Sequence, residues 1–160
     1  MARVMLIGLD TNAISRLAPI LKDARCALAD VPDQQGALEL ALTWQPDLAV
    51  VEVGNSTVAG VGIASLRVAL KAPLIAIGLA GEDERTAALE RGADDCLSGP
   101  LDPLELAARI LVILRRHLPA GAEDFARPLH MLAHQSDGQA HPARSQRSWH
   151  RGLLGRHAWR

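Results

Sequence analysis

The sequence has few aromatic residues, few cysteines and no long hydrophobic run. It contains three Trp, one Phe and no Tyr, so aliphatic side chains must fill the core. The two cysteines, Cys26 and Cys96, are too few for a disulfide framework or a thiolate metal site, and they suit a reduced, cytosolic compartment. No stretch approaches the roughly 20 apolar residues that span a bilayer, and the first residues lack a secretory signal pattern. We therefore expect a soluble, cytoplasmic protein with no membrane span.

The charges are divided unevenly along the chain. Residues 1–117 carry 11 Lys and Arg against 15 Asp and Glu, a net charge of −4, whereas residues 118–160 carry 6 Arg against 3 acids, a net charge of +3. All six histidines lie at or after His117. This change of sign and composition predicts a domain over 1–117 followed by a basic tail over 118–160.

The first 117 residues alternate between two hydrophobic periods. Short runs that are apolar at every position, at 4–7, 48–51 and 74–77, indicate strands buried on both faces, and 26–29 and 95–98 are weaker strand candidates. Helical patterns fill the intervals, with one apolar face over Ile14, Leu17, Ala18 and Leu21, a second over Leu104, Ala108, Leu111 and Leu114, and good helix formers at 34–44, 61–71 and 82–91.

Residues typical of helix ends agree with this pattern. Asp33 and Asp102 are expected N-caps, Pro103 occupies a first helical position, and Gly92 follows a helix end. Five strand–helix units in about 115 residues predict a doubly wound α/β fold with a five-stranded parallel sheet.

Three segments and the closing helix carry a family resemblance. The stretches 46–48 (PDL), 92–95 (GADD) and 99–106 (GPLDPLEL) resemble signature stretches of bacterial response-regulator receiver domains. The helix that contains 108–110 and 114–116 is similar to that of the OmpR-type, winged-helix class. The resemblance covers about residues 3–117. It implies the CheY-like strand order 2-1-3-4-5, with chemistry at the carboxyl ends of the first and third strands.

A receiver moves a phosphoryl group from a histidine kinase to its own aspartate. That reaction needs an acidic pair and the acceptor Asp to hold Mg²⁺, and a hydroxyl and a Lys to meet the phosphoryl charge. In this chain the corresponding positions are Gly8 and Leu9 for the acidic pair, Glu52 for the phosphoacceptor, Gly78 for the hydroxyl, Gly99 for the Lys and Cys96 for the switch aromatic. The Lys is followed in the family by a proline, usually through a cis peptide bond, and here Pro100 follows Gly99.

Every position that the chemistry requires is therefore changed, and Asp10 is the remaining acid after the first strand. We predict neither phosphotransfer nor Mg²⁺ binding, and so no enzymatic activity, no cofactor and no metal. Two alternatives stay open for Glu52: it imitates a phosphorylated Asp, or it is a solvated residue at a strand end. Asp10 is either a residual metal ligand together with Glu52 or, as we favour, a helix N-cap. A third reading is a receiver still phosphorylated on Glu52 or Asp10.

The resemblance also implies a protein-binding face. In OmpR-type regulators the fourth helix, fifth strand and fifth helix form a symmetric dimer through charge pairs, which set register more than affinity. An alternative is that these are ordinary solvated charges. The residues here that resemble the pairs are Glu90, Arg91, Asp94, Asp95, Arg109, Arg115 and Arg116.

The tail has no sustained hydrophobic period, and its composition predicts disorder. His130 and His134 lack further ligands at metal-binding spacing. The run from Trp149 to Arg160 is basic and contains two Trp, so weak contact with nucleic acid or an anionic membrane is one reading and a sticky end is another.

The sequence thus predicts a phosphorylation-independent signalling module of a two-component phosphorelay, which binds a protein partner or itself. The alternative is the N-terminal regulatory domain of a truncated OmpR-type transcriptional regulator, because 43 residues after His117 are too few for a winged helix.

Overall fold

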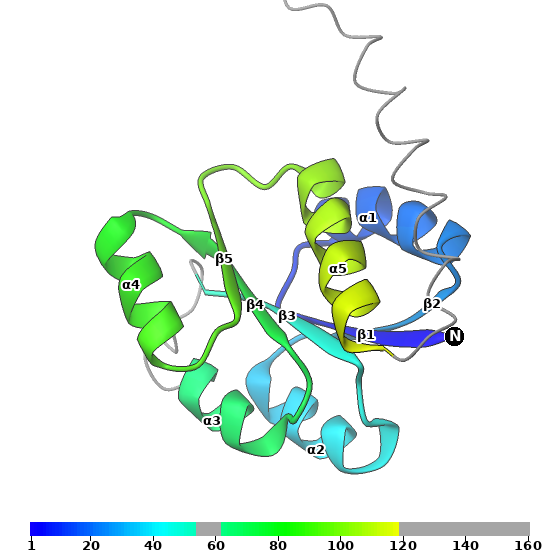
Figure 1. The fold of residues 1–160 in the computed structure, drawn as a ribbon, viewed down its shortest axis with the longest axis horizontal. Helices are drawn as coiled ribbons and strands as arrows, with labels where there is room; N and C mark the ends of the chain where they lie inside the picture. Colours follow the sequence, from blue (N-terminus) through cyan, green and yellow to red (C-terminus); the bar gives the residue numbers. More distant parts are fainter. Residues whose placement is uncertain (54–61, 119–160) are drawn as a thin grey trace, which may run out of the picture.

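The computed structural model describes residues 1–53 and 62–118. Its centre is one parallel five-stranded sheet with the strand order β2-β1-β3-β4-β5 (Figure 1). This confirms the predicted fold and strand order. None of the helices in the described ranges combines the length and apolar character needed to cross a bilayer. The strands are β1 (Ala2–Ile7), β2 (Cys26–Val31), β3 (Leu48–Glu52), β4 (Leu74–Leu79) and β5 (Asp95–Ser98).

Helices cover both faces of the sheet. Helices α1 and α5 lie on one face, and α2, α3 and α4 lie on the other (Figure 1). The expected helices at 61–71 and 82–91 are slightly shorter in the structure, and the one at 34–44 has the expected bounds. The helices are α1 (Thr11–Asp23), α2 (Gln34–Trp44), α3 (Gly62–Ala69), α4 (Glu82–Glu90) and α5 (Pro103–His117).

The uninterrupted apolar strands supply two cores at once. Successive side chains of a strand point to opposite faces. In β1, Val4 and Leu6 therefore pack with the α1/α5 layer, while Met5 and Ile7 pack with the layer of α2, α3 and α4. All four are at most 2% exposed. A strand that alternated apolar and polar residues would leave one of these layers without a core.

The predicted helix caps are present. The carboxylates of Asp33 and Asp102 accept hydrogen bonds from the backbone N–H groups of Gly36 (2.8 Å) and Leu104 (2.9 Å). Gly92 follows the end of α4 with a φ of +105°. Asp33 and Asp102 each satisfy a backbone donor that the first helical turn leaves unpaired.

Two aspartate carboxylates accept hydrogen bonds from backbone N–H groups at the amino edge of the sheet. Asp47 accepts a hydrogen bond from the backbone N–H of Arg3 on β1 (2.7 Å), and Asp94 accepts one from the backbone N–H of Leu74 on β4 (2.8 Å). Asp94 also pairs with Arg67 of α3 (3.1 Å). The PDL and GADD stretches thus have a structural role: each supplies an acceptor to the first residues of a neighbouring strand.

We expect Asp94→Ala to lower the free energy of unfolding by about 1–3 kcal/mol, because the N–H of Leu74 loses its side-chain acceptor and the guanidinium of Arg67 loses one of its acceptors. Chemical denaturation would measure this loss. Asp30→Ala is the matched control, since Asp30 is an exposed residue of β2. Equal stability of the two variants would contradict the role given to Asp94.

The two cysteines lie on opposite edges of the sheet, Cys26 in β2 and Cys96 in β5. Both are buried and free. Burial raises the pKa of Cys26 to about 11, so its thiol is protonated and weakly nucleophilic at neutral pH.

Candidate functional site at the carboxyl edge of the sheet

Four of the changed positions lie at the carboxyl ends of four neighbouring strands. Gly8 follows β1, Glu52 ends β3, Gly78 lies near the end of β4, and Gly99 follows β5. A Cβ atom built on Gly8 would lie 3.9 Å from the backbone oxygen of Glu52. The fold therefore brings together the positions that the resemblance pairs with phosphoryl chemistry.

The backbone at the three glycines is unsuited to other residues. Gly8, Gly78 and Gly99 have φ angles of +74°, +76° and +81°. L-residues enter this left-handed region at a cost of about 1–2 kcal/mol each. The resemblance assigns an acidic, a hydroxyl and a Lys side chain to these three positions, and the backbone there has a conformation that disfavours such side chains.

A bulge surrounds Gly78. In the β4–β5 pairing Ala76 lies opposite Cys96 and Leu79 lies opposite Ser98, so β4 has one more residue than β5 in this interval. A bulge of this kind bends the strand and redirects its side chains. Gly78 and Gly99 line a hollow of about 10 Å³, room for about one water molecule. The peptide bond from Gly99 to Pro100 is trans, unlike the cis bond usual in the family.

Glu52 and Asp10 lie together across the ends of β3 and β1. Burial raises the pKa of the Glu52 carboxyl, the negative charge of Asp10 raises it further, and a hydrogen bond from the backbone N–H of Asp10 lowers it. The Asp10 carboxylate itself accepts a hydrogen bond from the N–H of Ala13 at 2.7 Å and caps α1. This confirms the N-cap prediction for Asp10.

The residues beside this pair fit Mg²⁺ poorly. Leu9 is only 8% exposed and packs into the α1/α5 core, and Gly8 has no ligand atom in its side chain. Mg²⁺ requires oxygen ligands in octahedral geometry. Among residues 1–53 and 62–118, no three His, Cys, Asp or Glu side chains come together as a metal-binding group.

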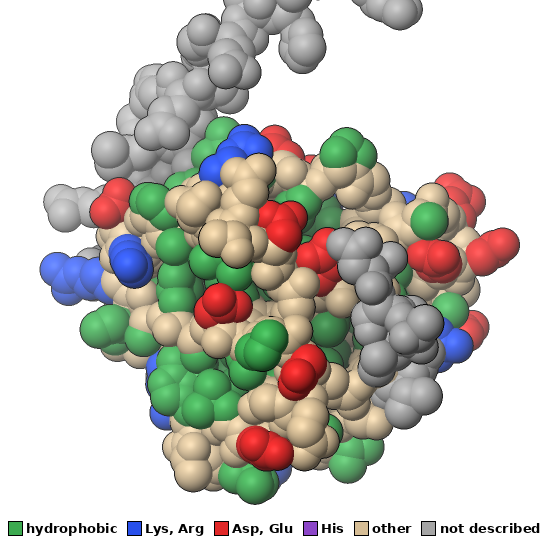
Figure 2. Space-filling model, turned by 180° about the vertical axis from the view of Figure 1, so that it is seen from behind, with side chains coloured by type: hydrophobic (Ala, Val, Ile, Leu, Met, Phe, Trp, Pro, Cys, Tyr) green, Lys and Arg blue, Asp and Glu red, His purple; other side chains and the backbone are tan. Residues whose placement is uncertain are grey.

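The charges at this edge are all negative. Within the described residues, no Lys or Arg lies in the loops that follow the strands or among the first three residues of any helix. Figure 2, which views the molecule from behind Figure 1, shows acidic side chains over the middle of the face, with Lys and Arg around its margin. Eight of the 15 acids of residues 1–117 lie at this edge: Asp10, Asp33, Glu52, Glu82, Asp83, Glu84, Asp102 and Glu105.

Replacing Glu52 should reveal its raised pKa. An acid whose pKa is raised by folding stabilises the fold below its usual value, about 4.5 here, and this contribution is lost as the pH rises through the folded-state pKa. Gln keeps an acceptor for the N–H of Asp10. We therefore expect Glu52→Gln to raise the melting temperature at neutral pH, relative to the wild type, more than it does below pH 4.5. The same difference at both pH values would contradict the pKa shift.

Cys96 is the residue predicted to replace the family's switch aromatic. Its side chain is 5% exposed, and its Sγ lies 3.9 Å from the backbone oxygen of Arg85 in α4. Burial raises the pKa of this thiol, and the carboxylate of Asp95 raises it further. A small, buried, protonated side chain has no ring that could change between inward and outward positions.

Three of the residues predicted to form charge pairs across a dimer face, Asp94, Asp95 and Arg109, make contacts within the chain. Arg109 binds Asp95 at 2.9 Å and Glu105 at 2.9 Å within the same chain, and its hydrogen bonds to Glu105 and Asp95 raise its pKa. Asp94 pairs with Arg67 instead, a partner that the sequence did not suggest. An experiment that swaps the charges of Asp95 and Arg109 would therefore test an intrachain pair.

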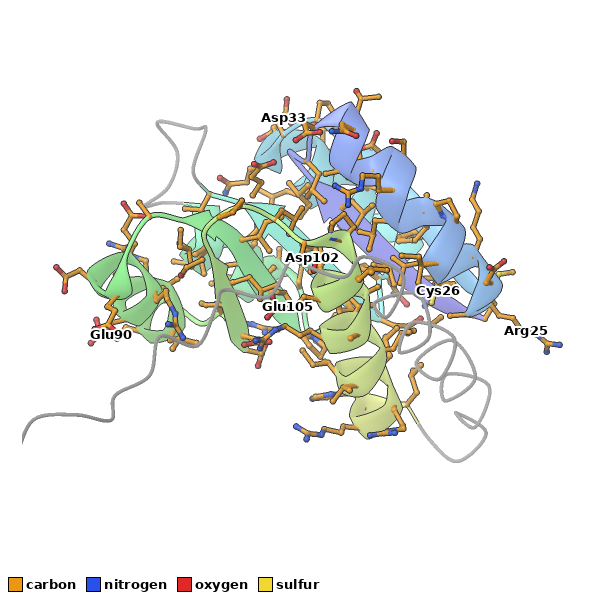
Figure 3. The ribbon with its side chains drawn as sticks, turned by 90° about the horizontal axis from the view of Figure 1, so that it is seen from above. Arg25, Cys26, Asp33, Glu90, Asp102 and Glu105 are labelled. Atoms are coloured by element: carbon orange, nitrogen blue, oxygen red, sulfur yellow. The ribbon has the colours of Figure 1, made fainter. Side chains whose placement is uncertain are left out.

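The remaining residues of this set are exposed. Glu90 and Arg91 lie at the end of α4, and Arg115 and Arg116 lie in the last turn of α5. Figure 3 shows Glu90 far from Asp102 and Glu105, which lie at the start of α5. The two Arg residues lie at the amino edge of the sheet, where they also suit the negative end of the α5 dipole.

Comparison with known proteins gives related sequences and related folds. No protein-family model matches the chain. It is 41% identical over 93 residues to the KDP operon transcriptional regulatory protein KdpE of Escherichia coli, which is 57% of this chain and 41% of that protein. It is 30% identical over 117 residues to the transcriptional regulatory protein PrrA of Mycobacterium tuberculosis, which is 71% of this chain and 50% of that protein. The chain spans about half the length of these relatives or less.

Solved structures show the same fold. The receiver domain of the TMAO respiratory system response regulator TorR superposes with a TM-score of 0.67 at 20% identity, over 74% of this chain and all of that one. A two-component response regulator from Clostridium difficile superposes with a TM-score of 0.65 at 24% identity, over 72% of this chain and 98% of that one. Both superpositions extend over nearly the whole of the matched structure.

Proposed function

We propose that this chain, which carries a receiver domain of the response-regulator family, is a signalling module that works without phosphorylation. Its outputs would be contacts with a protein partner or a second copy of itself. Residues 1–117 would form the working domain, and residues 118–160 would form a separate tail. Residues 119–160 lie outside the part of the chain that the structure describes. Two-component signalling is the setting that the relatives suggest.

The observation that carries this proposal is the backbone and charge of the carboxyl edge. Phosphoryl transfer depends on positive charge placed where negative charge develops. Here three glycines with positive φ occupy the positions of the acid, the hydroxyl and the Lys, and the described loops at this edge contain no cation. An incoming phosphoryl donor would meet Glu52 and Asp10, both acidic, with no positive charge beside them.

The proposed working surface is the face formed by α4, β5 and α5. Because Arg109 is bound to Asp95 and Glu105, and Asp94 to Arg67, the members of the predicted interface set left for a partner are Glu90, Arg91, Arg115 and Arg116. They include both signs on one face, which suits a two-fold interface that pairs a patch with itself. The intrachain cluster around Arg109 would hold β5 and α5 in the geometry that the interface requires.

We expect Arg115→Glu combined with Arg116→Glu to shift the chain from dimer towards monomer, because like charges would then face each other across the interface. Light scattering over a range of protein concentrations would measure the shift. Arg16→Glu, on the exposed face of α1, is the matched control and should leave the mass unchanged. A wild-type chain that is monomeric at every concentration would overturn the dimer proposal and leave a heterologous protein partner.

A second candidate function follows from the relatives, which are named transcriptional regulators and are about twice as long as the matched region. In this case residues 1–117 would be the regulatory half of a DNA-binding regulator. Sequencing the nucleotides downstream of codon 117 in all three reading frames tests this. A winged-helix coding sequence in another frame would support it, and its absence would oppose it.

A further inference from the structure

A groove lies beside the changed site, between α3 and α4 at the carboxyl ends of β3 and β4. Its volume is about 360 Å³. The buried side chains of Val53, Ile63 and Leu79 form its floor, and Ala87 and Ala88 of α4 form one wall. A groove with an apolar floor and this volume can accept a large aromatic side chain, which gains free energy by leaving water.

The rim of the groove is charged, with an excess of acid. Asp83, Glu84 and Arg91 are its charged lining residues, and all three are exposed. Glu82 precedes them in the first turn of α4. The Glu84 carboxylate accepts a hydrogen bond from the N–H of Ala80 at 2.7 Å, which leaves its charge and its second oxygen available. The groove thus offers apolar contact below and negative charge above.

One segment of the same chain has the complementary chemistry. Residues 144–160 contain five Arg and no acid, together with Trp149 and Trp159. The distribution of charge in the domain also favours contact between this basic segment and the groove, because eight of the 15 acids of residues 1–117 lie at the carboxyl edge of the sheet. In Figure 3, Asp33 lies at the opposite end of β2 from Arg25 and Cys26.

The intervening chain is long enough. The helix α5 ends at the amino edge, and its 15 residues measure about 22 Å along the axis. The 25 residues 119–143 reach at most about 80 Å when extended, and a random coil of that length spans about 27 Å on average. The segment can therefore reach the groove from the end of α5 without straining the connection.

We propose that residues 144–160 dock in the groove of their own chain, with one Trp side chain on the apolar floor and Arg side chains paired with Asp83 and Glu84. Arg–carboxylate contacts are charge-assisted and directional. Docking would occupy Arg91, which also belongs to the proposed dimer face, so the bound tail would compete with partners for the end of α4. This inference adds a binding function to the groove and does not depend on whether the domain dimerises.

Paramagnetic NMR on the full chain tests the docking. Ser148→Cys provides a labelling site for a nitroxide, because Cys26 and Cys96 are buried. We expect selective loss of amide signal intensity for residues 83–91, with little loss on α1. The loss should diminish in high salt, which screens exposed charges. It should also diminish in Asp83→Lys, while Glu39→Lys on the exposed face of α2 serves as control and should leave it unchanged.

Three results would overturn the proposal. One is uniform or absent broadening, and another is selective broadening on a different surface. The third comes from a mixture in which one set of chains carries the isotope label and the other set carries the nitroxide. If residues 83–91 broadened in that mixture as strongly as within one doubly labelled chain, the tail would be docking on another copy. Unchanged broadening in Asp83→Lys would remove the charge argument. Amide spectra of each variant that retain the wild-type dispersion establish that the domain remains folded.

Discussion

Replacing Gly8, Gly78 and Gly99 together by alanine is expected to lower the free energy of unfolding by about 3–6 kcal/mol, at about 1–2 kcal/mol for each left-handed residue. For Gly8 and Gly99 the cost comes from the backbone and not from a clash. A Cβ atom on Gly8 would lie 3.8 Å from its nearest neighbour, and one on Gly99 would have none within 4 Å. Because small domains unfold at about 5–15 kcal/mol, this loss would leave the triple variant marginal.

Chemical denaturation of the three single variants and the triple variant measures the effect. Gly81→Ala is the matched control, since Gly81 has a φ of −161° and its Cβ would also meet nothing within 4 Å. We expect at most about 1 kcal/mol there, from the weaker N-cap. Equal losses at Gly81 and at the other three positions would show that the positive φ angles are not the cause.

The same positions explain why restoring the family's side chains should fail. A variant with Gly8→Asp, Glu52→Asp, Gly78→Thr and Gly99→Lys carries the missing chemistry on a backbone that disfavours three of the four residues. We expect it to lose about as much stability as the alanine variant, so that any phosphorylation would be limited by the folded fraction. Recovery of wild-type stability in this variant would contradict the account.

Leu111→Ala is expected to lower the free energy of unfolding by about 2–5 kcal/mol, the usual range for removing a buried Leu side chain. Leu111 is fully buried in the core between the sheet and the α1/α5 layer. Its side chain fills space that Ala cannot, and the surrounding core residues would close the cavity only in part. The packing of α5 against the sheet therefore depends on Leu111.

Equilibrium denaturation followed by circular dichroism measures this loss. The matched control is Leu42→Ala, the same substitution at a side chain of α2 that is 80% exposed. Exposed positions of this kind usually change stability by less than about 0.5 kcal/mol. A loss at Leu42 as large as that at Leu111 would place the core elsewhere.

The elements and their order could be predicted from the sequence because their signals are local. The run 48–51 is apolar at every position, which indicates a strand covered on both faces, and β3 spans Leu48–Glu52. Asp33 and Asp102 precede helical patterns and cap α2 and α5. The strand order came from the family resemblance, since five strand–helix units alone allow more than one arrangement.

The geometry of the site could not be read in the same way, because it depends on contacts between distant residues. The glycine at position 78 was visible in the sequence. Its positive φ and the bulge around it depend on how β4 pairs with β5, which the sequence does not show. The charge of Arg109 was visible too, yet the sequence could not show that Asp95 binds it within the chain. Arg67 carried no motif, and its contact with Asp94 joins residues 27 positions apart.

The most direct test of the central claim is incubation of the full chain with acetyl phosphate and Mg²⁺, followed by intact-mass measurement, beside a receiver domain that has the usual aspartate and Lys. We predict that the control gains one phosphoryl group and that this chain gains none. An alkali-labile phosphoryl adduct mapped to Glu52 or Asp10 would contradict the account, because it would show that the carboxyl edge still supports phosphotransfer without the cation and the hydroxyl.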